Sequence, residues 1–323
     1  MKLFDLDKIK DQRIIIVGDV MLDAYIFGHV HRLSPEAPVP IVEQRSQEYR
    51  LGGAANVALN IKAMGATPLL FGVTGSDDDA LILKKELEKN QISALLLVEE
   101  LDRLTTVKTR IIGNNHQLLR VDKEVTHAIT EHTESLLLEK LKSEIKTADA
   151  LIFEDYEKGL LNKNLIQHII SLCNEFNVPV IVDPKKSNFL AYSNATLFKP
   201  NLKELKEGLK LDKLDSLEEI ERAAKTLIQT LNLKYLMVTL SDRGVIICDA
   251  QSTHHVPAHL RKIADVSGAG DTVVSIAALA IAQHLEPRAI AELSNLAGGL
   301  VCEEVGVVPL NKNRFMDEAN KLI

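Results

Sequence analysis

The stretch "ADVSGAGDTVVSIAALAIA" at residues 264–282 places an acidic residue, Asp271, between a glycine-rich turn and a long apolar run. The run predicts a buried helix that begins near Asp271, with the backbone N–H groups of Gly268, Ala269 and Gly270 at its N-terminus. Unpaired N–H groups and the helix dipole both favour an anion at such a position. Asp271 is therefore either a helix cap or a carboxylate beside a bound anion, and a cap does not require glycines on both sides of Ala269.

Strand-like and helix-like segments alternate through most of the chain. Strands are predicted at residues 13–19, 68–75, 150–156, 178–184, 195–201 and 235–244, and helices at 54–65, 77–90, 162–177 and 216–232. This alternation predicts a mostly parallel sheet covered by helices. Residues 26–50 and 105–122 break the rhythm with short alternating stretches and a "GNN" turn, which predicts a small β flap, or lid, over one edge of the sheet. We expect one domain over residues 1–323.

Composition narrows the class of protein. The 323 residues carry a net charge of −7, which argues against a nucleic-acid partner. The three cysteines, Cys173, Cys248 and Cys302, lie far apart and indicate a reduced, cytoplasmic protein. The N-terminal residues lack an apolar signal core, and no apolar run approaches the roughly 20 residues that a membrane span requires. We therefore expect no membrane partner.

Polar residues follow several predicted strands at the point where each strand ends. Ligands of open α/β sheets bind at this edge. One such residue alone is more often a turn or cap residue, but five strand ends of this kind favour a binding site. The residues are Asp19 with Asp23, Glu154 with Asp155, Asp183 with Lys185 and Lys186, Lys199 with Asn201 and Glu204, and Thr239 with Ser241 and Gly244.

A carboxylate beside a phosphate-binding loop can accept the proton of an alcohol that attacks a phosphoryl group. The loop N–H groups would stabilise the charge that develops on the phosphate oxygens. The chain has no GxxxxGK[ST] loop, which excludes a P-loop enzyme. It also lacks an N-terminal GxGxxG, which disfavours a Rossmann dehydrogenase.

The sequence resembles the ribokinase-like (PfkB) sugar kinases over nearly its whole length. Both motifs of that family occur in order, "GGAAN" at residues 52–56 and "DVSGAGD" at 265–271, with "KPNLKE" and "TLSDRG" between them. Ser241 departs from the glycine that is usual in the family. Three further stretches, at residues 18–42, 108–122 and 154–161, resemble the heptose 7-phosphate kinases of lipopolysaccharide-core precursor synthesis. Glu154 departs from the small residue common there.

The resemblance implies a three-layer α/β/α kinase that uses ATP with Mg²⁺. Asp271 would be the general base, and Gly268, Ala269 and Gly270 the anion hole. The ATP site would comprise Asn201, Leu202, Lys203, Glu204, Thr239, Ser241, Gly244 and Asn295, with Asn201 and Glu204 organising Mg²⁺ through water. Sugar hydroxyls would contact Asp19, Gly52, Gly53 and Asn56, and Asp155 and Asp183 would complete the substrate site. The sugar phosphate would contact Arg110, Arg120, Lys158 and Lys185.

The expected reaction is phosphorylation of the anomeric hydroxyl of heptose 7-phosphate. The alternatives are a related kinase for another sugar or sugar phosphate and, from a different class, an inactive nucleotide- or sugar-binding protein. Whether a monovalent cation binds near Asp265 and Ser267 stays open. The resemblance implies a homodimer, because flaps of this family often pair between subunits. Many relatives carry a nucleotidyltransferase domain behind the kinase, and the absence of an HxGH element here leads us to expect the kinase half alone.

Overall fold

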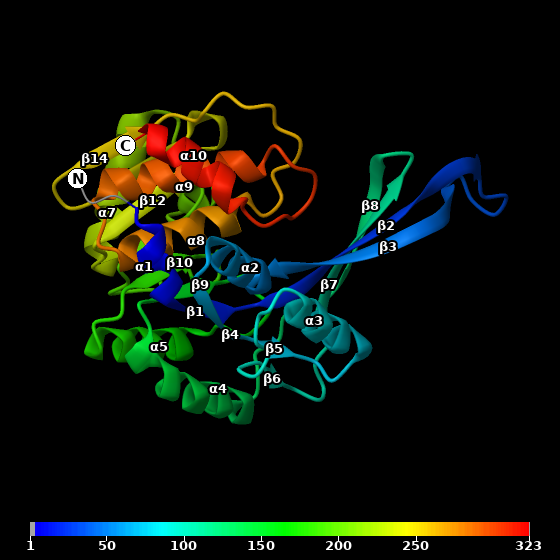
Figure 1. Ribbon diagram of the computed structural model, residues 1–323, viewed down its shortest axis with the longest axis horizontal. Helices are drawn as coiled ribbons and strands as arrows, with labels where there is room; N and C mark the ends of the chain where they lie inside the picture. Colours follow the sequence, from blue (N-terminus) through cyan, green and yellow to red (C-terminus); the bar gives the residue numbers. More distant parts are fainter. Residues whose placement is uncertain (1–3, 323) are drawn as a thin grey trace.

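A computed structural model describes residues 4–322 of the chain (Figure 1). Its main sheet has eight strands in the order β14-β13-β12-β11-β10-β9-β1-β4. The six strands from β12 to β4 in this order run parallel, and β13 and β14 join them antiparallel at one edge. These strands are β1 (Arg13–Gly18), β4 (Thr67–Phe71), β9 (Ala150–Glu154), β10 (Val180–Asp183), β11 (Leu197–Phe198), β12 (Tyr235–Thr239), β13 (Val245–Cys248) and β14 (Thr253–Val256). The predicted mostly parallel α/β sheet is confirmed.

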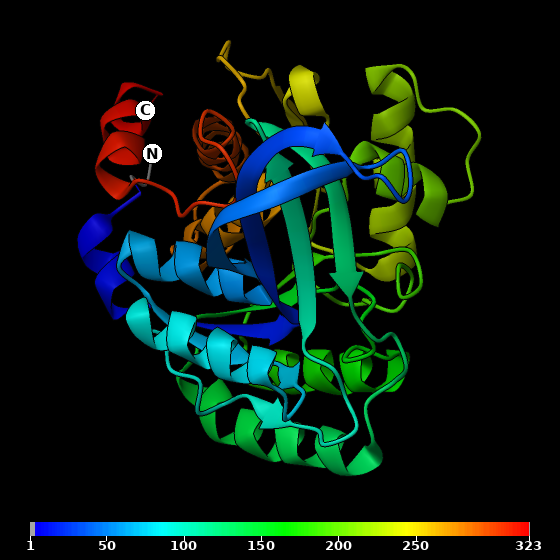
Figure 2. The ribbon, with the colours of Figure 1, turned by 90° about the vertical axis from the view of Figure 1, so that its right-hand side faces the viewer.

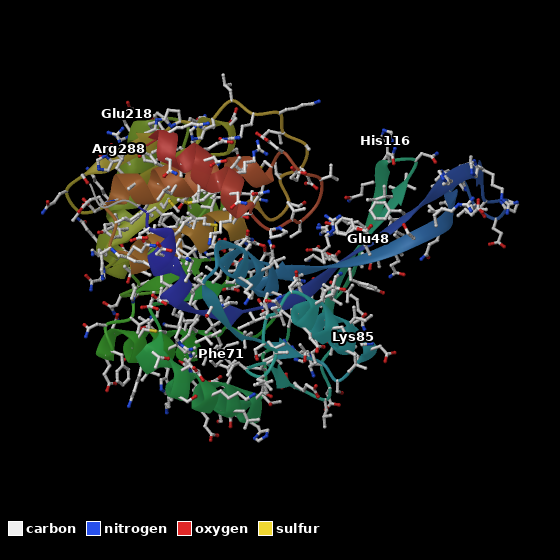
Figure 3. All side chains as sticks on the ribbon, viewed as in Figure 1. Glu48, Phe71, Lys85, His116, Glu218 and Arg288 are labelled. Carbon is white, nitrogen blue, oxygen red and sulfur yellow. The ribbon has the colours of Figure 1, made fainter. Side chains whose placement is uncertain are left out.

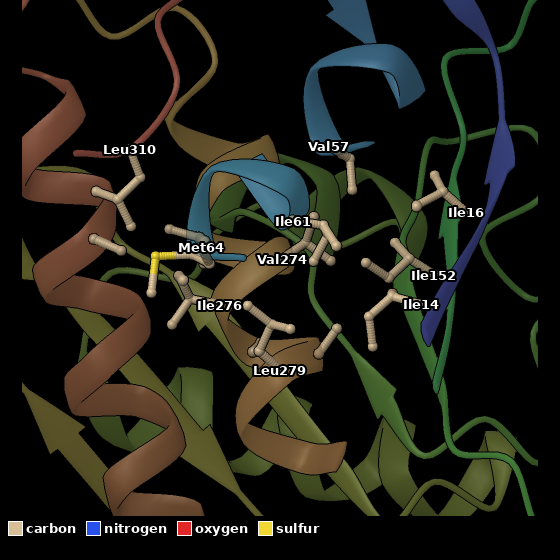
Figure 4. Close-up of a cluster of buried hydrophobic side chains, with 14 of the residues drawn as sticks. Ile14, Ile16, Val57, Ile61, Met64, Ile152, Val274, Ile276, Leu279 and Leu310 are labelled. Atoms are coloured by element: carbon tan, nitrogen blue, oxygen red, sulfur yellow. The ribbon is translucent and has the colours of Figure 1, made fainter. Parts of the chain in front are cut away.

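Helices cover both faces of this sheet and give three layers. One apolar cluster joins the sheet to α1 (Leu6–Asp11), α2 (Ala54–Met64), α8 (Ala269–Ala282), α9 (Pro287–Val301) and α10 (Lys312–Leu322). Figure 4 shows its centre, where Ile14 and Ile152 of the sheet face Ile61 of α2 and Val274 of α8. The other cluster packs α4 (Glu131–Glu144), α5 (Lys163–Glu175), α6 (Leu202–Gly208) and α7 (Leu217–Leu231) against the opposite face. Both clusters are mostly aliphatic, and the second also contains Phe71, Phe153, Phe189, Tyr192 and Phe198.

Residues that break the α/β rhythm form a second sheet, the lid, with strand order β3-β2-β7-β8. Its strands are β2 (Val20–Leu33), β3 (Pro40–Gly53), β7 (Thr106–Gly113) and β8 (His116–Lys123). The first pair extends beyond the predicted segment 26–50 at both ends, and the second pair matches 105–122 closely. Asn114 and Asn115 both have positive φ, at 51° and 65°, which suits the tight turn predicted from "GNN". The lid projects from the body in Figure 1, faces the viewer in Figure 2, and carries the labelled Glu48 and His116 in Figure 3.

The remaining elements are short or peripheral. Helix α3 (Asp78–Lys89) packs near the base of the lid, and β5 (Val73–Thr74) pairs with β6 (Val98–Glu99). Two 3-10 turns occupy Ile145–Thr147 and Ser241–Arg243. Within residues 4–322, no helix combines the length and apolar character that a membrane crossing needs.

The sheet register places ionisable residues side by side at the carboxyl ends of the central strands. Glu154 of β9 is level with Gly18 of β1 on one side and with Asp183 of β10 on the other. Strand alternation puts Glu154 and Asp183 on the face of Ile152 and Ile181, the face that α8 covers. This edge lies beside the N-terminus of α8, so the fold brings the distant motifs to one place.

Candidate active site

Asp271 lies in the first turn of α8, but its side chain does not cap the helix. The cap residue is Gly268, whose φ of 77° suits glycine, and no side chain caps the N–H groups of this end. The Asp271 carboxylate instead accepts hydrogen bonds from Asn56 Nδ2 at 2.7 Å and from the Tyr156 hydroxyl at 3.0 Å. The carboxylate is therefore held by distant parts of the chain, and the helix N-terminus is left for another anion.

Burial gives Asp271 the proton affinity of a base that works near neutral pH. Only 4% of the residue is exposed, and burial raises the pKa of its carboxyl from 3.8 to about 6. The hydrogen bond from Asn56 opposes this rise, and the charge of Asp183 adds to it. A carboxylate of this pKa is ionised at pH 7 and still accepts a proton more readily than an exposed aspartate does.

A buried ion pair lies beside the glycine loop. Lys199 Nζ is 2.8 Å from Asp183 Oδ2, and both side chains are almost fully buried. A Cβ atom built on Gly270 would lie 3.6 Å from that carboxylate oxygen and 3.8 Å from the ammonium. Burial lowers the pKa of Lys199, but Asp183 and Glu204 outweigh it, so the ammonium stays charged. The sequence marked Lys199 as a polar residue at the end of a predicted strand but gave it no role in the site.

Glu154 has no hydrogen-bond partner for either carboxylate oxygen, although the residue is fully buried. Burial raises the pKa of its carboxyl well above the usual range, and the charges of Asp183 and Asp271 raise it further. Its protonated form is therefore favoured.

Asn201 and Glu204 form a reciprocal capping box at the start of α6. Asn201 Oδ1 accepts from the Glu204 N–H, and Glu204 Oε2 accepts from the Asn201 N–H, each at 2.8 Å. Glu204 Oε1 lies 2.6 Å from Lys185 Nζ. Asn201 is thus a helix cap that also fixes the Glu204 carboxylate. The structure places Lys185 beside Glu204.

The donor set suits a magnesium ion that is bound mostly by phosphates and water. Among the residues described, no group of three or more His, Cys, Asp or Glu side chains is arranged to hold a metal ion alone. Mg²⁺ in nucleotide sites usually takes one or two carboxylates together with substrate phosphates and water. Glu204, oriented by its capping box, fits that role.

A cavity of about 580 Å³ opens next to the anion hole. Its walls come from the turn after β12, the loop before α8, and helices α8 and α9, and they include the predicted residues Thr239, Ser241, Gly244, Ala269, Gly270 and Asn295. An adjoining cavity is lined by Asn201, Leu202, Lys203, Thr239 and Ser241. Seven of the eight predicted ATP residues therefore line two adjoining cavities, which share Thr239 and Ser241. The eighth, Glu204, lies beside them in α6. The loop residues His259 and Arg261 and the glycines of α9 were not predicted.

Two residues of the turn after β12 have positive φ angles. Ser241 has a φ of 55°, a conformation that favours glycine, the residue usual here in the family that the sequence resembles. Gly244 has a φ of 87°, and a Cβ there would lie 2.0 Å from the Val256 carbonyl oxygen. Asn295 donates to the Pro257 carbonyl at 2.8 Å, so it is a satisfied polar residue that also lines the cavity.

The predicted sugar-side residues divide into two groups. Asp19 accepts from the backbone N–H groups of Tyr156 and Lys158, and burial raises the pKa of its carboxyl to about 6. Gly52 and Gly53 lead into α2, and a Cβ on either would clash with a neighbouring oxygen atom of Asp23 or Asp19. Asp155, in contrast, is engaged by Glu157, Asn188 and Tyr192, the last of which belongs to the opposite apolar cluster.

The predicted phosphate-binding cations gather at the lid, except for Lys185. Arg110 pairs with Asp23 and lies over the Tyr25 ring, and Lys158 Nζ is 3.0 Å from Glu124. Arg120 is half exposed and pairs with Asp122. Lys108 was not predicted, but it shares Glu124 with Lys158 and has a mostly buried side chain. Its period-2 spacing from Arg110 on a strand was the available signal.

Asp265 organises the loop that precedes the anion hole. Its Oδ1 accepts from the N–H and hydroxyl of Ser267, and its Oδ2 accepts from the Gly306 N–H at 2.9 Å. These bonds orient the loop toward α8. They neither require nor exclude the monovalent cation left open by the sequence.

Comparison with known proteins agrees with this geometry. Residues 11–313 match the model of the pfkB family carbohydrate kinases. The chain belongs to the pfkB family of carbohydrate kinases. The kinase is 38% identical over 307 residues to bifunctional protein HldE of Koribacter versatilis, covering 95% of this chain and 63% of that protein. It is 40% identical over 296 residues to HldE of Histophilus somni, covering 91% and 61%. The kinase thus spans about three-fifths of the length of these curated relatives.

Solved structures confirm the ribokinase-like fold of this kinase. Phosphofructokinase-2 from Escherichia coli, in complex with potassium, superposes with a TM-score of 0.80 at 18% identity, over 96% of this chain and 99% of that one. A ribokinase from Arabidopsis thaliana, complexed with ribose and ATP, gives a TM-score of 0.75 at 14% identity, over 95% and 98%. At such identities the likeness establishes the fold alone.

Proposed function

We propose that this kinase transfers the γ-phosphate of ATP to the anomeric hydroxyl of D-glycero-D-manno-heptose 7-phosphate and forms the 1,7-bisphosphate. The observation that carries the kinase chemistry is the Asp271 carboxylate, buried beside the open N-terminus of α8 and held by Asn56 of the sugar-side motif. The heptose assignment rests on the resemblance of residues 18–42, 108–122 and 154–161 and on the similarity to the HldE proteins.

In the proposed reaction, Asp271 accepts the proton of the acceptor hydroxyl, the oxygen of that hydroxyl bonds to the γ-phosphorus, and the bond from that phosphorus to the ADP oxygen breaks. The N–H groups of Ala269 and Gly270, at the positive end of α8, stabilise the charge on the transferring phosphoryl group. Lys199 lies close to Gly270 and adds a fixed positive charge. Mg²⁺, oriented by Glu204, supplies further neutralisation of the phosphate oxygens when it is bound.

The lid would recognise the phosphate that the sugar already carries. Lys108, Arg110 and Lys158 place three cations near one another, each paired with a carboxylate of Asp23 or Glu124. An incoming phosphate can take over part of these pairs, because its oxygens accept the same charge-assisted hydrogen bonds. Lid closure over the sugar would also exclude water from the reacting phosphate.

The test compares kcat/KM for heptose 7-phosphate with the values for heptose, ribose and fructose 6-phosphate. Charge-assisted contacts contribute about 1.5–3 kcal/mol each, so two of them predict a preference of roughly 10²-fold or more for the phosphorylated heptose. Phosphorus NMR of the product should show two phosphate groups, one of them anomeric. A clear preference for a free sugar would contradict the heptose assignment.

A related kinase for another sugar or sugar phosphate is the second candidate, and Glu154 is the observation that favours it. Its buried carboxyl replaces the small residue common in similar heptose kinases. The same substrate panel separates the two candidates. An inactive binding protein is disfavoured, because Asp271, its two hydrogen-bond donors and the glycine loop are all in place.

We also propose that two copies pair through their lids. The lid exposes several large apolar side chains, Leu33, Val39, Leu118, Leu119 and Val121. Exposed apolar side chains concentrated on one sheet are typical of an interaction surface. Light scattering on the purified protein should give twice the mass of one chain, and Leu119→Glu with Val121→Glu should give a monomer.

A further inference from the structure

The Tyr156 hydroxyl donates a hydrogen bond to Asp271, the proposed base, and the kinase reaction gives no reason for this bond. It donates to Asp271 Oδ1 at 3.0 Å, while Oδ2 accepts from Asn56 Nδ2 at 2.7 Å. Both oxygens of the carboxylate therefore have donors before any sugar binds. The acceptor hydroxyl of a sugar must reach one of these two oxygens for its proton to be removed.

Of the two donors, Tyr156 is the one that resembles the acceptor. Its O–H group presents the same alcohol-type donor to Asp271 that a sugar hydroxyl presents. Burial raises the pKa of the Tyr156 phenol well above the usual range, and the surrounding carboxyls of Asp271, Glu154 and Asp183 raise it further. The phenol therefore stays protonated and acts only as a donor to Asp271.

Tyr156 is less enclosed than Asn56. Asn56 is fully buried in α2. Tyr156 is partly exposed in the loop after β9 and belongs to neither hydrophobic cluster. Its backbone N–H donates to Asp19 Oδ2 at 2.8 Å, which fixes the backbone. The Lys185 ammonium lies over its ring, 5.2 Å from the ring centroid. Rotation of the side chain therefore breaks one hydrogen bond and one ring contact, without opening the core.

We propose that the Tyr156 hydroxyl takes the place of the acceptor hydroxyl on Asp271 until a sugar displaces it, and so suppresses hydrolysis of ATP by water. This inference rests on the proposed role of Asp271 as the base. In the suppressed reaction, a water oxygen would bond to the γ-phosphorus, the bond from that phosphorus to the ADP oxygen would break, and the water proton would pass to Asp271. With Tyr156 in place, a water molecule has to compete with the phenol for Asp271 Oδ1.

The test measures release of inorganic phosphate from MgATP in the absence of sugar. Tyr156→Phe keeps the ring and its contact with Lys185 but removes the donor to Asp271. We expect this variant to release phosphate roughly tenfold faster than the wild-type enzyme, a modest part of the ~10²–10⁴-fold that a general base contributes. Its kcat with the preferred sugar should fall by less than about threefold, since the sugar itself supplies the hydroxyl to Asp271.

Tyr192→Phe is the matched control. Tyr192 also donates from a buried hydroxyl to an aspartate, Asp155, at 2.8 Å, but it belongs to the opposite apolar cluster. Loss of that bond should leave phosphate release in the absence of sugar unchanged. Thermal unfolding of both variants separates a loss of stability from a change at the base.

The double variant Tyr156→Phe with Asp271→Asn tests whether Asp271 activates the water that hydrolyses ATP in the absence of sugar. Phosphate release should return to the wild-type level or below; an increase that persists would mean that water is not activated by Asp271, and would overturn the inference. An unchanged rate in Tyr156→Phe, or a large loss of kcat with sugar and no added hydrolysis, would overturn it as well. If Asp271→Asn alone retains sugar phosphorylation, the role of Asp271 as the base fails, whereas a lack of sugar kinase activity in the wild-type enzyme would contradict the proposed function.

Discussion

Asn56 Nδ2 lies 2.7 Å from Asp271 Oδ2, a hydrogen bond between two residues that are 215 positions apart in the chain. It joins α2, which begins after the glycines of the sugar-side motif, to α8, which begins within the phosphate-side motif. Asn56 thereby orients the proposed base from the sugar side. A change at either motif should alter both the position and the proton affinity of Asp271.

Replacement of Asp271 by Asn should abolish phosphoryl transfer while ATP still binds. A general base contributes ~10²–10⁴-fold to the rate, so kcat should fall by at least that factor. The same variant should be more stable at pH 7, because burial raises the pKa of Asp271 from 3.8 to about 6, which makes its ionised form costly by on the order of 2–3 kcal/mol. Calorimetric titration with ATP and thermal unfolding measure the two effects. Near-wild-type turnover would refute the base assignment.

The acid limb of the pH profile should report Asp271. Its pKa of about 6 predicts that kcat/KM falls as the pH drops below about 6, since the protonated carboxyl cannot accept the sugar proton. Loss of the Asn56 bond favours the protonated form, so Asn56→Ala should move this limb to higher pH. A limb near pH 4 in the wild-type enzyme would contradict the assignment.

The contribution of the Asp271 and Asp19 carboxyls to the free energy of unfolding should fall as the pH rises, whereas kcat/KM should increase. The folded-state pKa values of Asp271 and Asp19 are both about 6, above the value of 3.8 for the unfolded chain. The folded protein therefore binds their protons more tightly, and the stability that these groups contribute falls as the pH rises from about 4 through 6. Urea unfolding of Asp19→Asn against wild type, at pH 5 and pH 7, should show the larger stabilisation by the substitution at pH 7.

The two glycines of the anion hole should respond differently to substitution. A Cβ on Gly270 meets only ordinary contacts, at 3.6 Å or more, so Gly270→Ala should fold normally. Its methyl group would lie between the phosphate path and the pair Asp183–Lys199, and should lower both kcat and the affinity for ATP. Gly268→Ala should instead destabilise the protein, because φ is 77° and the Cβ would lie 2.9 Å from Asn56 Nδ2. Gly270→Val should show the Gly270→Ala defect in stronger form, and a fully active Gly270→Val enzyme would remove the anion-hole assignment.

Lys185 and Lys158, both predicted from the sequence to contact the sugar phosphate, should have different kinetic effects when they are replaced. Lys185 is 2.6 Å from Glu204, so Lys185→Ala should lower kcat and weaken the dependence of the rate on Mg²⁺ concentration. Lys158 pairs with Glu124 under the lid, so Lys158→Ala should mainly raise the KM for the phosphorylated sugar. The ratio of kcat/KM for phosphorylated and free sugar measures this difference. A loss of that preference in Lys185→Ala alone would return Lys185 to the sugar-phosphate site.

The α/β fold was predictable because its signals are local. Helix α5 begins after Asn162, which accepts hydrogen bonds from Asn164 and Leu165, and α7 begins with the Ser216 and Glu219 capping box. Gly65 and Asn232 end their helices in the left-handed conformation that a capping residue of their type favours. The first lid segment was predicted too narrowly, at 26–50, because β2 and β3 continue past it by pairing with each other from Val20 and Gly53 onward.

The sequence by itself determined the two glycine motifs, the acidic residue of the second, and the strand ends that carry polar groups. Only the tertiary structure decided which of those groups meet: Asp155 turns toward Tyr192, Lys185 toward Glu204, and Tyr156 reaches Asp271. The physical reason is that helix caps and strand alternation depend on neighbours a few residues away. The hydrogen bonds of Asp271 instead join residues 115 and 215 positions distant, whose approach depends on sheet order and helix packing.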